Sequence, residues 1–192
     1  MSGFLAPVAI SARHVHLSRD DRIALFFNTE LKKLRDLSQP GQYATTETVT
    51  ISTDFGSIEG VRVLGPDRAE TQVEVSATDA RTLKLDAPIR LSGDLEGTPG
   101  LTITAKNGKS IRIKRGVIVA ARHLHLSSAE AGEFGVGDGQ VVAARFTSDL
   151  RSGTLENIVV RVADDFTIDL HVDTDEGNAV GVVPGARAEV FL

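Results

Sequence analysis

The chain has 192 residues, with 21 basic and 26 acidic side chains, a net charge of -5 at pH 7 and no cysteine. This length fits one large domain or two small ones, and an apolar content of 41% is ordinary for a folded protein. The negative charge argues against nucleic-acid binding, and no apolar run approaches the roughly 20 residues that a membrane span requires. Without cysteine, disulfides, thiolate metal ligands and a cysteine nucleophile are excluded.

The predicted elements, taken in chain order, are mostly short strands. The first predicted strand begins near the N-terminus and runs into the string SARHVHLS at residues 11–18. Ser18 then precedes a short predicted helix, because a serine followed by acidic residues is a typical N-terminal cap. Most of the later chain alternates apolar and polar residues or carries β-branched residues, as strands do. Asn107-Gly108 lies between two such runs and predicts a two-residue hairpin loop.

The string AARHLHLS at residues 120–127 is nearly the same as the first motif. Four of the five histidines in the chain lie in these two copies. In the second copy, Ser127 or Ser128 caps a short predicted helix that ends just before Gly135. This repeat, together with many short strands, predicts a mostly β fold of two pseudo-symmetric small β-barrels capped by short α-helices.

Each copy of the motif is a candidate metal site. Two residues at positions i and i+2 of a strand face the same side and lie about 6.6 Å apart. Because zinc–imidazole bonds are about 2.0 Å long, each pair can bind one ion, His14 with His16 and His123 with His125. Hydrogen-bonded core or surface histidines are the alternative for either copy alone. The repetition favours metal binding.

A catalytic metal site also needs a third protein ligand, and His171 is the candidate for one histidine pair. Its alternative role is a strand-end histidine paired with Asp169 or Asp173. For the other pair the third ligand must be a carboxylate. Glu74 is the candidate because it shares one strand face with Gln72, although a solvated carboxylate fits this pattern equally well.

Arg68 is the candidate for holding an anion. It lies in a Gly-Pro loop shortly before Glu74, and a guanidinium there can bind phosphate or carboxylate through two hydrogen bonds. A surface ion pair with Asp67 or Glu70 is the alternative. The basic residues around Asn107-Gly108 are interpreted as a solvated hairpin face.

Five blocks in order resemble the PduL-type phosphate propanoyltransferases, also called phosphotransacylases: SARHVHLS, LRDLSQPGQYA, VRVLGPDRAETQVEVS, AARHLHLS and LHVDTDEGNAV. They cover nearly the whole chain. The resemblance implies reversible transfer of a short acyl group, acetyl or propanoyl, between coenzyme A and phosphate. It implies direct attack by phosphate, assisted by a dinuclear zinc site, and a homodimer.

The same resemblance implies roles for individual residues. One zinc ion would be held by His14, His16 and Glu74, and the second by His123, His125 and His171. Such ligands also accept cobalt, manganese or iron. Arg68 would bind phosphate as the catalytic residue. The positions that would line the coenzyme A site are Ser11, Arg35, Arg62, Leu64, His171 and Asn178.

The resemblance also implies the domain organisation. Residues 1–12 with 121–192 would form one barrel, and residues 13–120 would form the other. The first strand begins almost at the first residue, so no microcompartment-targeting extension is evident. We therefore expect a free cytoplasmic enzyme, and the absence of cysteine suits that compartment.

Two other protein classes fit part of the pattern. Cupin-like metal enzymes also place H-x-H, a carboxylate and a later histidine on a β-barrel, and Asp20 and Glu130 follow the two motifs at loosely similar spacing. Each histidine pair would then need its own later histidine, and only His171 remains. A metal-stabilised β-barrel binding module would instead hold closed structural sites with no open position.

Overall fold

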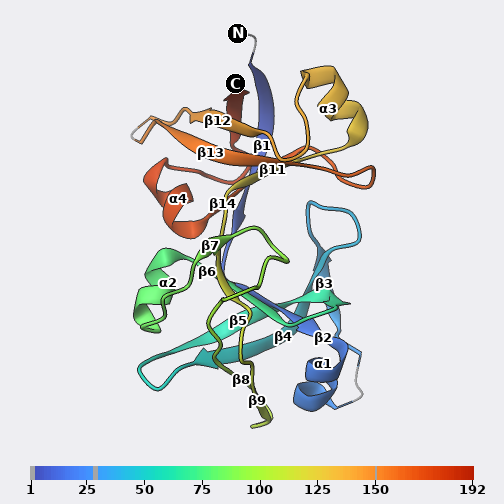
Figure 1. The fold of residues 1–192 in the computed structure, drawn as a ribbon, viewed down its shortest axis with the longest axis vertical. Coiled ribbons are helices and arrows are strands. Elements are labelled where there is room, and N and C mark those ends of the chain that lie inside the picture. Colours follow the sequence, from blue (N-terminus) through green and yellow to red (C-terminus); the bar gives the residue numbers. More distant parts are fainter. Residues whose placement is uncertain (1–2, 28–29, 150) are drawn as a thin grey trace. The chain divides into compact units, whose positions relative to one another are not determined.

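The computed structural model describes residues 3–27, 30–149 and 151–192 and consists mostly of strands with a few short helices (Figure 1). By their contacts these residues divide into two compact units. The barrel unit comprises the chain up to Ser11, Ser38–Pro40 and Ala121–Leu192. The sheet unit comprises Ala12–Leu37 and Gly41–Ala120.

The barrel unit is a closed β-barrel with two short helices. Its elements are β1 (Phe4–Ser11), β11 (His123–Leu126), α3 (Ser128–Phe134), β12 (Val141–Phe146), β13 (Gly153–Val162), β14 (Asp169–Asp173), α4 (Thr174–Ala179) and β15 (Arg187–Phe191). The strands pair in the order β1-β14-β11-β13-β12-β15, and β15 pairs back onto β1. The N-terminal strand, blue in Figure 1, therefore lies between two C-terminal strands. The apolar core of the barrel unit includes the buried residues Leu124, Val160 and Leu170.

The sheet unit is one sheet that curls into a half-barrel. Its elements are β2 (His14–Ser18), α1 (Arg19–Phe26), β3 (Lys33–Asp36), β4 (Tyr43–Ser52), β5 (Ser57–Arg68), β6 (Gln72–Val75), α2 (Ala77–Thr82), β7 (Ile89–Arg90), β8 (Thr102–Ala105), β9 (Ser110–Arg112) and β10 (Val117–Ala120). The strand order is β7-β10-β6-β2-β5-β4-β8-β9, and β3 pairs with β4. A second apolar core, which includes Val15, Ile51 and Val63, lies in this unit.

The predicted mostly β class, with barrel-like architecture and short helices, is confirmed. The sheet unit is more open than the closed barrel of the other unit. The expected domain bounds, residues 1–12 with 121–192 for one barrel and 13–120 for the other, stay a prediction. Within these ranges, residues 1, 2, 28, 29 and 150 lie outside the described residues. Among the described residues, no helix is long and apolar enough to cross a membrane.

The repeat in the sequence is also a repeat in topology. In each unit the strand that carries H-x-H lies between one parallel and one antiparallel neighbour. β2 pairs parallel with β5 and antiparallel with β6, while β11 pairs parallel with β13 and antiparallel with β14. In both units a short helix follows the antiparallel neighbour at once, α2 after β6 and α4 after β14.

Local capping explains where the short helices begin. Ser18 caps α1 by accepting a hydrogen bond from the backbone N–H of Asp21, and Ser127 caps α3 in the same way. Gly135 ends α3 in the left-handed conformation at φ 67°, which glycine adopts without strain. These caps confirm two predicted helices. The sequence reasoning did not predict α2 and α4, which begin with reciprocal capping boxes after β6 and β14.

The predicted hairpin at Asn107-Gly108 forms between β8 and β9, but its loop is longer than predicted. Ala105 donates a backbone hydrogen bond to the carbonyl of Lys109, so residues 106–108 make a three-residue loop. Gly108 has a φ of 85° and is therefore in the left-handed conformation that ends a three-residue hairpin loop. The predicted loop length of two residues was therefore wrong by one residue.

Candidate metal centres

Strands β2 and β6 bring His14, His16 and Glu74 together in the sheet unit. His14 lies directly across the antiparallel pair from Glu74, and His16 follows on the same face. One donor atom from each residue lies within 4.8 Å of the others. The Nε2 atom of His14 is 3.5 Å from Oε2 of Glu74. All three side chains are buried.

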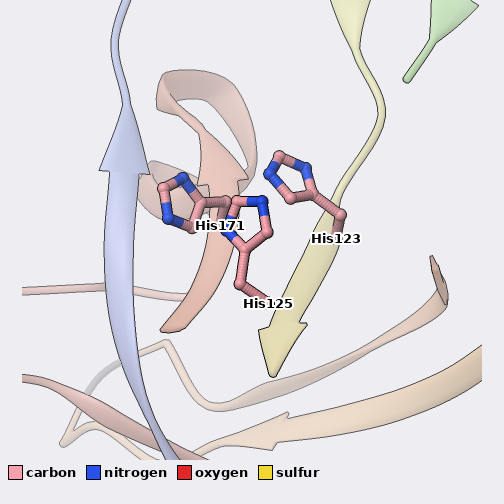
Figure 2. Close-up of side chains that lie close together, drawn as sticks. All are labelled: His123, His125 and His171. Atoms are coloured by element: carbon pink, nitrogen blue, oxygen red, sulfur yellow. The ribbon is translucent and has the colours of Figure 1, made fainter. Parts of the chain in front are cut away.

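Strands β11 and β14 bring His123, His125 and His171 together in the barrel unit. His123 lies directly across the antiparallel pair from His171. Figure 2 shows the three imidazole rings gathered in one place. Their ring centroids lie 4.6 to 4.9 Å apart. Their donor atoms also lie within 4.8 Å of one another. The two clusters are thus built by equivalent strands of the two units.

Hydrogen bonds orient the histidine rings. In both His14 and His123, Nδ1 is 2.8 Å from the carbonyl oxygen of the residue two places earlier, which requires a hydrogen on Nδ1. The lone pair of Nε2 then faces the cluster. His171 is oriented through its other nitrogen, because Nε2 lies 2.9 Å from Oδ2 of Asp169 and leaves Nδ1 as the donor atom.

The remaining histidines supply buried nitrogen atoms that could bind a cation. Among the described residues, the Nδ1 atoms of His16 and His125 are buried and have no hydrogen-bond partner. Burying such a nitrogen unpaired costs about 1–3 kcal/mol, and a bound metal ion removes that cost. Histidine and carboxylate donors suit zinc and other divalent transition metals. The residues present therefore fit one metal ion in each cluster.

Burial keeps the central histidines neutral. It lowers the pKa of His16 well below the ordinary value, and the charges on His14 and Arg68 lower it further. Burial together with the neighbouring His123 and His171 lowers the pKa of His125 to about 2. A neutral imidazole is the form that binds a metal ion. Burial also lowers the pKa of His14, but the carboxylate of Glu74 and hydrogen bonds raise it more, so its pKa is raised overall.

Arg68 lies at the end of β5, near the cluster of the sheet unit. Its positive charge lowers the pKa of both His14 and His16. Its Nη1 donates a hydrogen bond to Oγ of Ser92 at 2.8 Å. The two carboxylates considered as surface partners are engaged by other arginines, Asp67 by Arg22 and Glu70 by Arg115.

The structure divides the expected coenzyme A positions between the two units. In the sheet unit, Arg62 and Leu64 lie on β5 directly beside His14 and His16, while Arg35 is exposed on β3. In the barrel unit, the expected positions are Ser11 at the end of β1, Asn178 in α4 and His171 on β14.

Polar neighbours of the third ligand were not assigned a role from the sequence. Gln72 lies two residues before Glu74 and donates a hydrogen bond from Nε2 to its Oε1 at 2.5 Å. Their common strand face is visible in the sequence. Ser92, which accepts hydrogen bonds from Gln72 and Arg68, comes from the loop between β7 and β8, and nothing local in the sequence points to it. Asp169, considered only as a structural partner of His171, takes the corresponding place in the barrel unit.

The acidic residues that a cupin-like site would use lie elsewhere. Asp20 is exposed in the first turn of α1. Glu130 caps α3 and accepts hydrogen bonds from the backbone N–H groups of Ser127 and Ile168. Within the described ranges, neither residue belongs to a group of donors that could hold a metal ion.

Comparison with known proteins identifies the family. The model of the phosphate propanoyltransferase family matches residues 7–183. A phosphate propanoyltransferase of Thermotoga maritima is 50% identical over 173 residues, which cover 90% of this chain and 82% of the relative. Relatives of the same name from Clostridioides difficile and Shewanella putrefaciens are 48% and 44% identical, over 96% and 97% of this chain and 88% of each relative. With its repeated histidine motifs in place, the chain belongs to the phosphate propanoyltransferase family of transferase enzymes.

Proposed function

We propose that the protein reversibly transfers a short acyl group, acetyl or propanoyl, between coenzyme A and inorganic phosphate. Acyl-CoA and phosphate then give acyl phosphate and free coenzyme A. Family membership supports this reaction. The structural observation that carries the proposal is the pair of three-donor clusters, each with a buried histidine nitrogen that lacks a partner among the described residues.

The two clusters are proposed to hold one metal ion each, with zinc as the ion that best suits their ligands. His14, His16 and Glu74 would hold one ion, and His123, His125 and His171 would hold the other. A bound ion of this kind acts as a Lewis acid that polarises a carbonyl and stabilises a departing thiolate. The hydrogen bonds to His14, His123 and His171 keep the donor nitrogens of these rings directed into the clusters.

Arg68 is proposed to hold the attacking phosphate. Its guanidinium has five N–H donors in a fixed fork that matches two phosphate oxygens, and one of these donors also bonds to Ser92. Held in this way, a phosphate oxygen attacks the thioester carbonyl carbon, a carbon–oxygen bond forms, and the carbon–sulfur bond breaks. The electron pair of that bond leaves with sulfur as the coenzyme A thiolate. The chain has no cysteine, which agrees with direct transfer rather than an acyl-cysteine intermediate.

Some of the residues that the family resemblance implies for the coenzyme A site suit an anionic ligand. Arg62 is anchored by hydrogen bonds from Nη1 to the carbonyls of Thr45 and Thr46, at 3.1 and 3.0 Å. Arg62 and the exposed Arg35 provide positive charge for the phosphates of coenzyme A. Leu64, beside His16, provides an apolar surface. Ser11, His171 and Asn178 complete the proposed set.

The decisive experiment measures free thiol released from acetyl-CoA and propanoyl-CoA, with and without phosphate, before and after chelator treatment. We expect release that requires both phosphate and metal. Release without phosphate would identify a metal-dependent thioesterase instead. No release by a protein shown to carry its metal ions would refute the proposed transferase activity.

The resemblance also supports a homodimer. One chain has a mass of 20.4 kDa, so light scattering during size-exclusion chromatography should give twice that value. A mass equal to one chain at the concentrations used for the activity measurement would contradict the dimer.

A further inference from the structure

We propose that Gln72 and Ser92 are positioning residues that join Glu74 to Arg68 through one chain of hydrogen bonds. This assignment rests on the proposed function, which makes Glu74 a metal ligand and Arg68 the phosphate-binding residue. Gln72 and Ser92 would then act through these two groups, without contact to the reacting atoms.

The chain of hydrogen bonds is continuous. The amide nitrogen of Gln72 donates to Oε1 of Glu74 at 2.5 Å and to Oγ of Ser92 at 2.8 Å. The same Ser92 oxygen accepts from Nη1 of Arg68 at 2.8 Å. Arg68 and Glu74 are thus linked through two side chains, all of them in the sheet unit.

The orientation of the Gln72 amide is determined by its surroundings. The backbone N–H of Gly93 lies 2.8 Å from Oε1 of Gln72, and an N–H group can only donate. The amide oxygen must therefore face Gly93, which directs both N–H bonds of the amide toward Glu74 and Ser92. The two lone pairs of the Ser92 oxygen are likewise used by Gln72 and Arg68. Since Gln72 is only 1% exposed, water cannot easily replace these bonds.

These bonds also select one oxygen of Glu74. Gln72 engages Oε1, whereas Oε2 is the oxygen that faces Nε2 of His14. The second oxygen is therefore the one on the side of the His14 imidazole, where the proposed ion would bind. Gln72 determines how the carboxylate is turned, and Ser92 determines where the Arg68 guanidinium lies relative to it.

The barrel unit uses the same position for the same purpose. Asp169 lies two residues before His171, as Gln72 lies two residues before Glu74, and it contacts Nε2 of His171 at 2.9 Å. The amide of Gln72 donates a hydrogen bond to the carboxylate of Glu74, whereas the carboxylate of Asp169 accepts one from the imidazole of His171. This matching of hydrogen-bond sense to ligand type supports a positioning role at both places.

The first experiment measures metal affinity in the full-length protein with Gln72→Met, which keeps the side-chain length but removes the amide. Zinc would be titrated against a chelating dye, and the visible absorption of the cobalt-loaded protein would be recorded. We expect one of the two ions to bind about 10- to 100-fold more weakly, with an altered cobalt spectrum, and the other ion to be unchanged. The matched control is Gln39→Met, because Gln39 is also buried but bonds to the backbone of Thr167 in the barrel unit.

The second experiment separates the two ends of the chain with Ser92→Ala. It removes one hydroxyl from a half-buried side chain, so it tests the link even where Gln72→Met fails to fold. We expect the KM for phosphate to rise about tenfold, the value for one lost hydrogen bond to a charged group, with the affinity for both metal ions unchanged. Ser92→Thr keeps the hydroxyl and should restore the KM.

Two results would overturn the positioning roles. One is a Gln72→Met protein whose metal affinities and cobalt spectrum equal those of Gln39→Met. The other is a Ser92→Ala protein with unchanged KM for phosphate. A wild-type protein that transfers no acyl group would refute the proposed function alone. The metal titrations would then still decide the role of Gln72, and calorimetric binding of inorganic phosphate would decide that of Ser92.

Discussion

Glu74 and His171 occupy the same place in the two repeats, each directly across an antiparallel strand pair from the first histidine of its motif. One residue is a carboxylate and the other an imidazole, so the two clusters carry different charge. A divalent ion bound by two histidines and one glutamate keeps less net positive charge than one bound by three histidines. The two sites are therefore related by topology but differ in their electrostatics.

Removing either third ligand should release one ion and leave the other. For both Glu74→Ala and His171→Ala we expect the metal content to fall by about one ion per chain, because two histidines alone rarely hold zinc. Elemental analysis of dialysed protein measures this directly. Glu70→Ala is the matched control, since Glu70 is paired with exposed Arg115 and lies outside both clusters. Full metal content in both ligand variants would contradict the assignment.

Arg68→Ala should abolish most activity without loss of metal. A charged donor that holds the attacking group typically contributes about 10²–10³ in turnover, and the metal ligands are untouched. Thiol release at saturating phosphate, with the metal content measured in parallel, checks both parts. Arg115→Ala is the control, since it removes the same charge from a surface ion pair with Glu70. An Arg68→Ala enzyme with full activity would remove this residue from the mechanism.

The core of the sheet unit should be sensitive to loss of volume at Ile103. This side chain is fully buried, so Ile103→Ala should lower the free energy of unfolding by about 2–5 kcal/mol. Ile89 is 67% exposed, and Ile89→Ala should change it by no more than about 0.5 kcal/mol. Urea denaturation of both variants tests the difference, and equal effects would mean that the core does not include Ile103.

Glu130 should make part of the stability depend on pH. Burial raises its pKa, but hydrogen bonds from the Ser127 N–H and hydroxyl and from the Ile168 N–H lower it more, so its pKa lies below 4.5 overall. A carboxylate with a lowered folded-state pKa stabilises the fold above its unfolded pKa, and this stabilisation is lost as pH falls through the folded pKa. Glu130→Gln should therefore lower the free energy of unfolding by about 1 kcal/mol near neutral pH. The difference from wild type should vanish well below pH 4.5.

The control for this prediction is Glu133→Gln, an exposed change in the same helix. It should behave like wild type at every pH. A Glu130→Gln effect that stayed constant down to low pH would show that the loss comes from packing rather than from the ionised carboxylate.

Local features of this fold were predictable from the sequence. The H-x-H strands and the caps at Ser18 and Ser127 depend on residues within a few positions of one another. The grouping of His171 and Glu74 with the two motifs followed from counting the available donors and from the family resemblance. The roles of these residues in metal binding and catalysis stay predictions.

Features that depend on distant parts of the chain were not predictable. Ser92 lies 24 residues after Arg68 and 20 after Gln72, and no periodic pattern records hydrogen bonds over such distances in the sequence. The helices α2 and α4 were missed although Ser76 with Asp79, and Asp173 with Glu176, form capping boxes. Each helix has only six residues and little apolar periodicity, so only its cap could have revealed it.

The pairing of β1 has a consequence for the order in which the protein can be made. Phe4 pairs with Val190 and Val8 pairs with Leu170, so the first strand to leave the ribosome finds its partners among the last. The strand pairs of the sheet unit all lie between His14 and Ala120, and they are complete long before β15 is translated. A nascent chain can therefore fold the sheet unit first. β1 can pair only after β14 and β15 have been translated, and this pairing closes a long loop. The proposed metal site of His14, His16 and Glu74 could thus assemble before His171 has been synthesised.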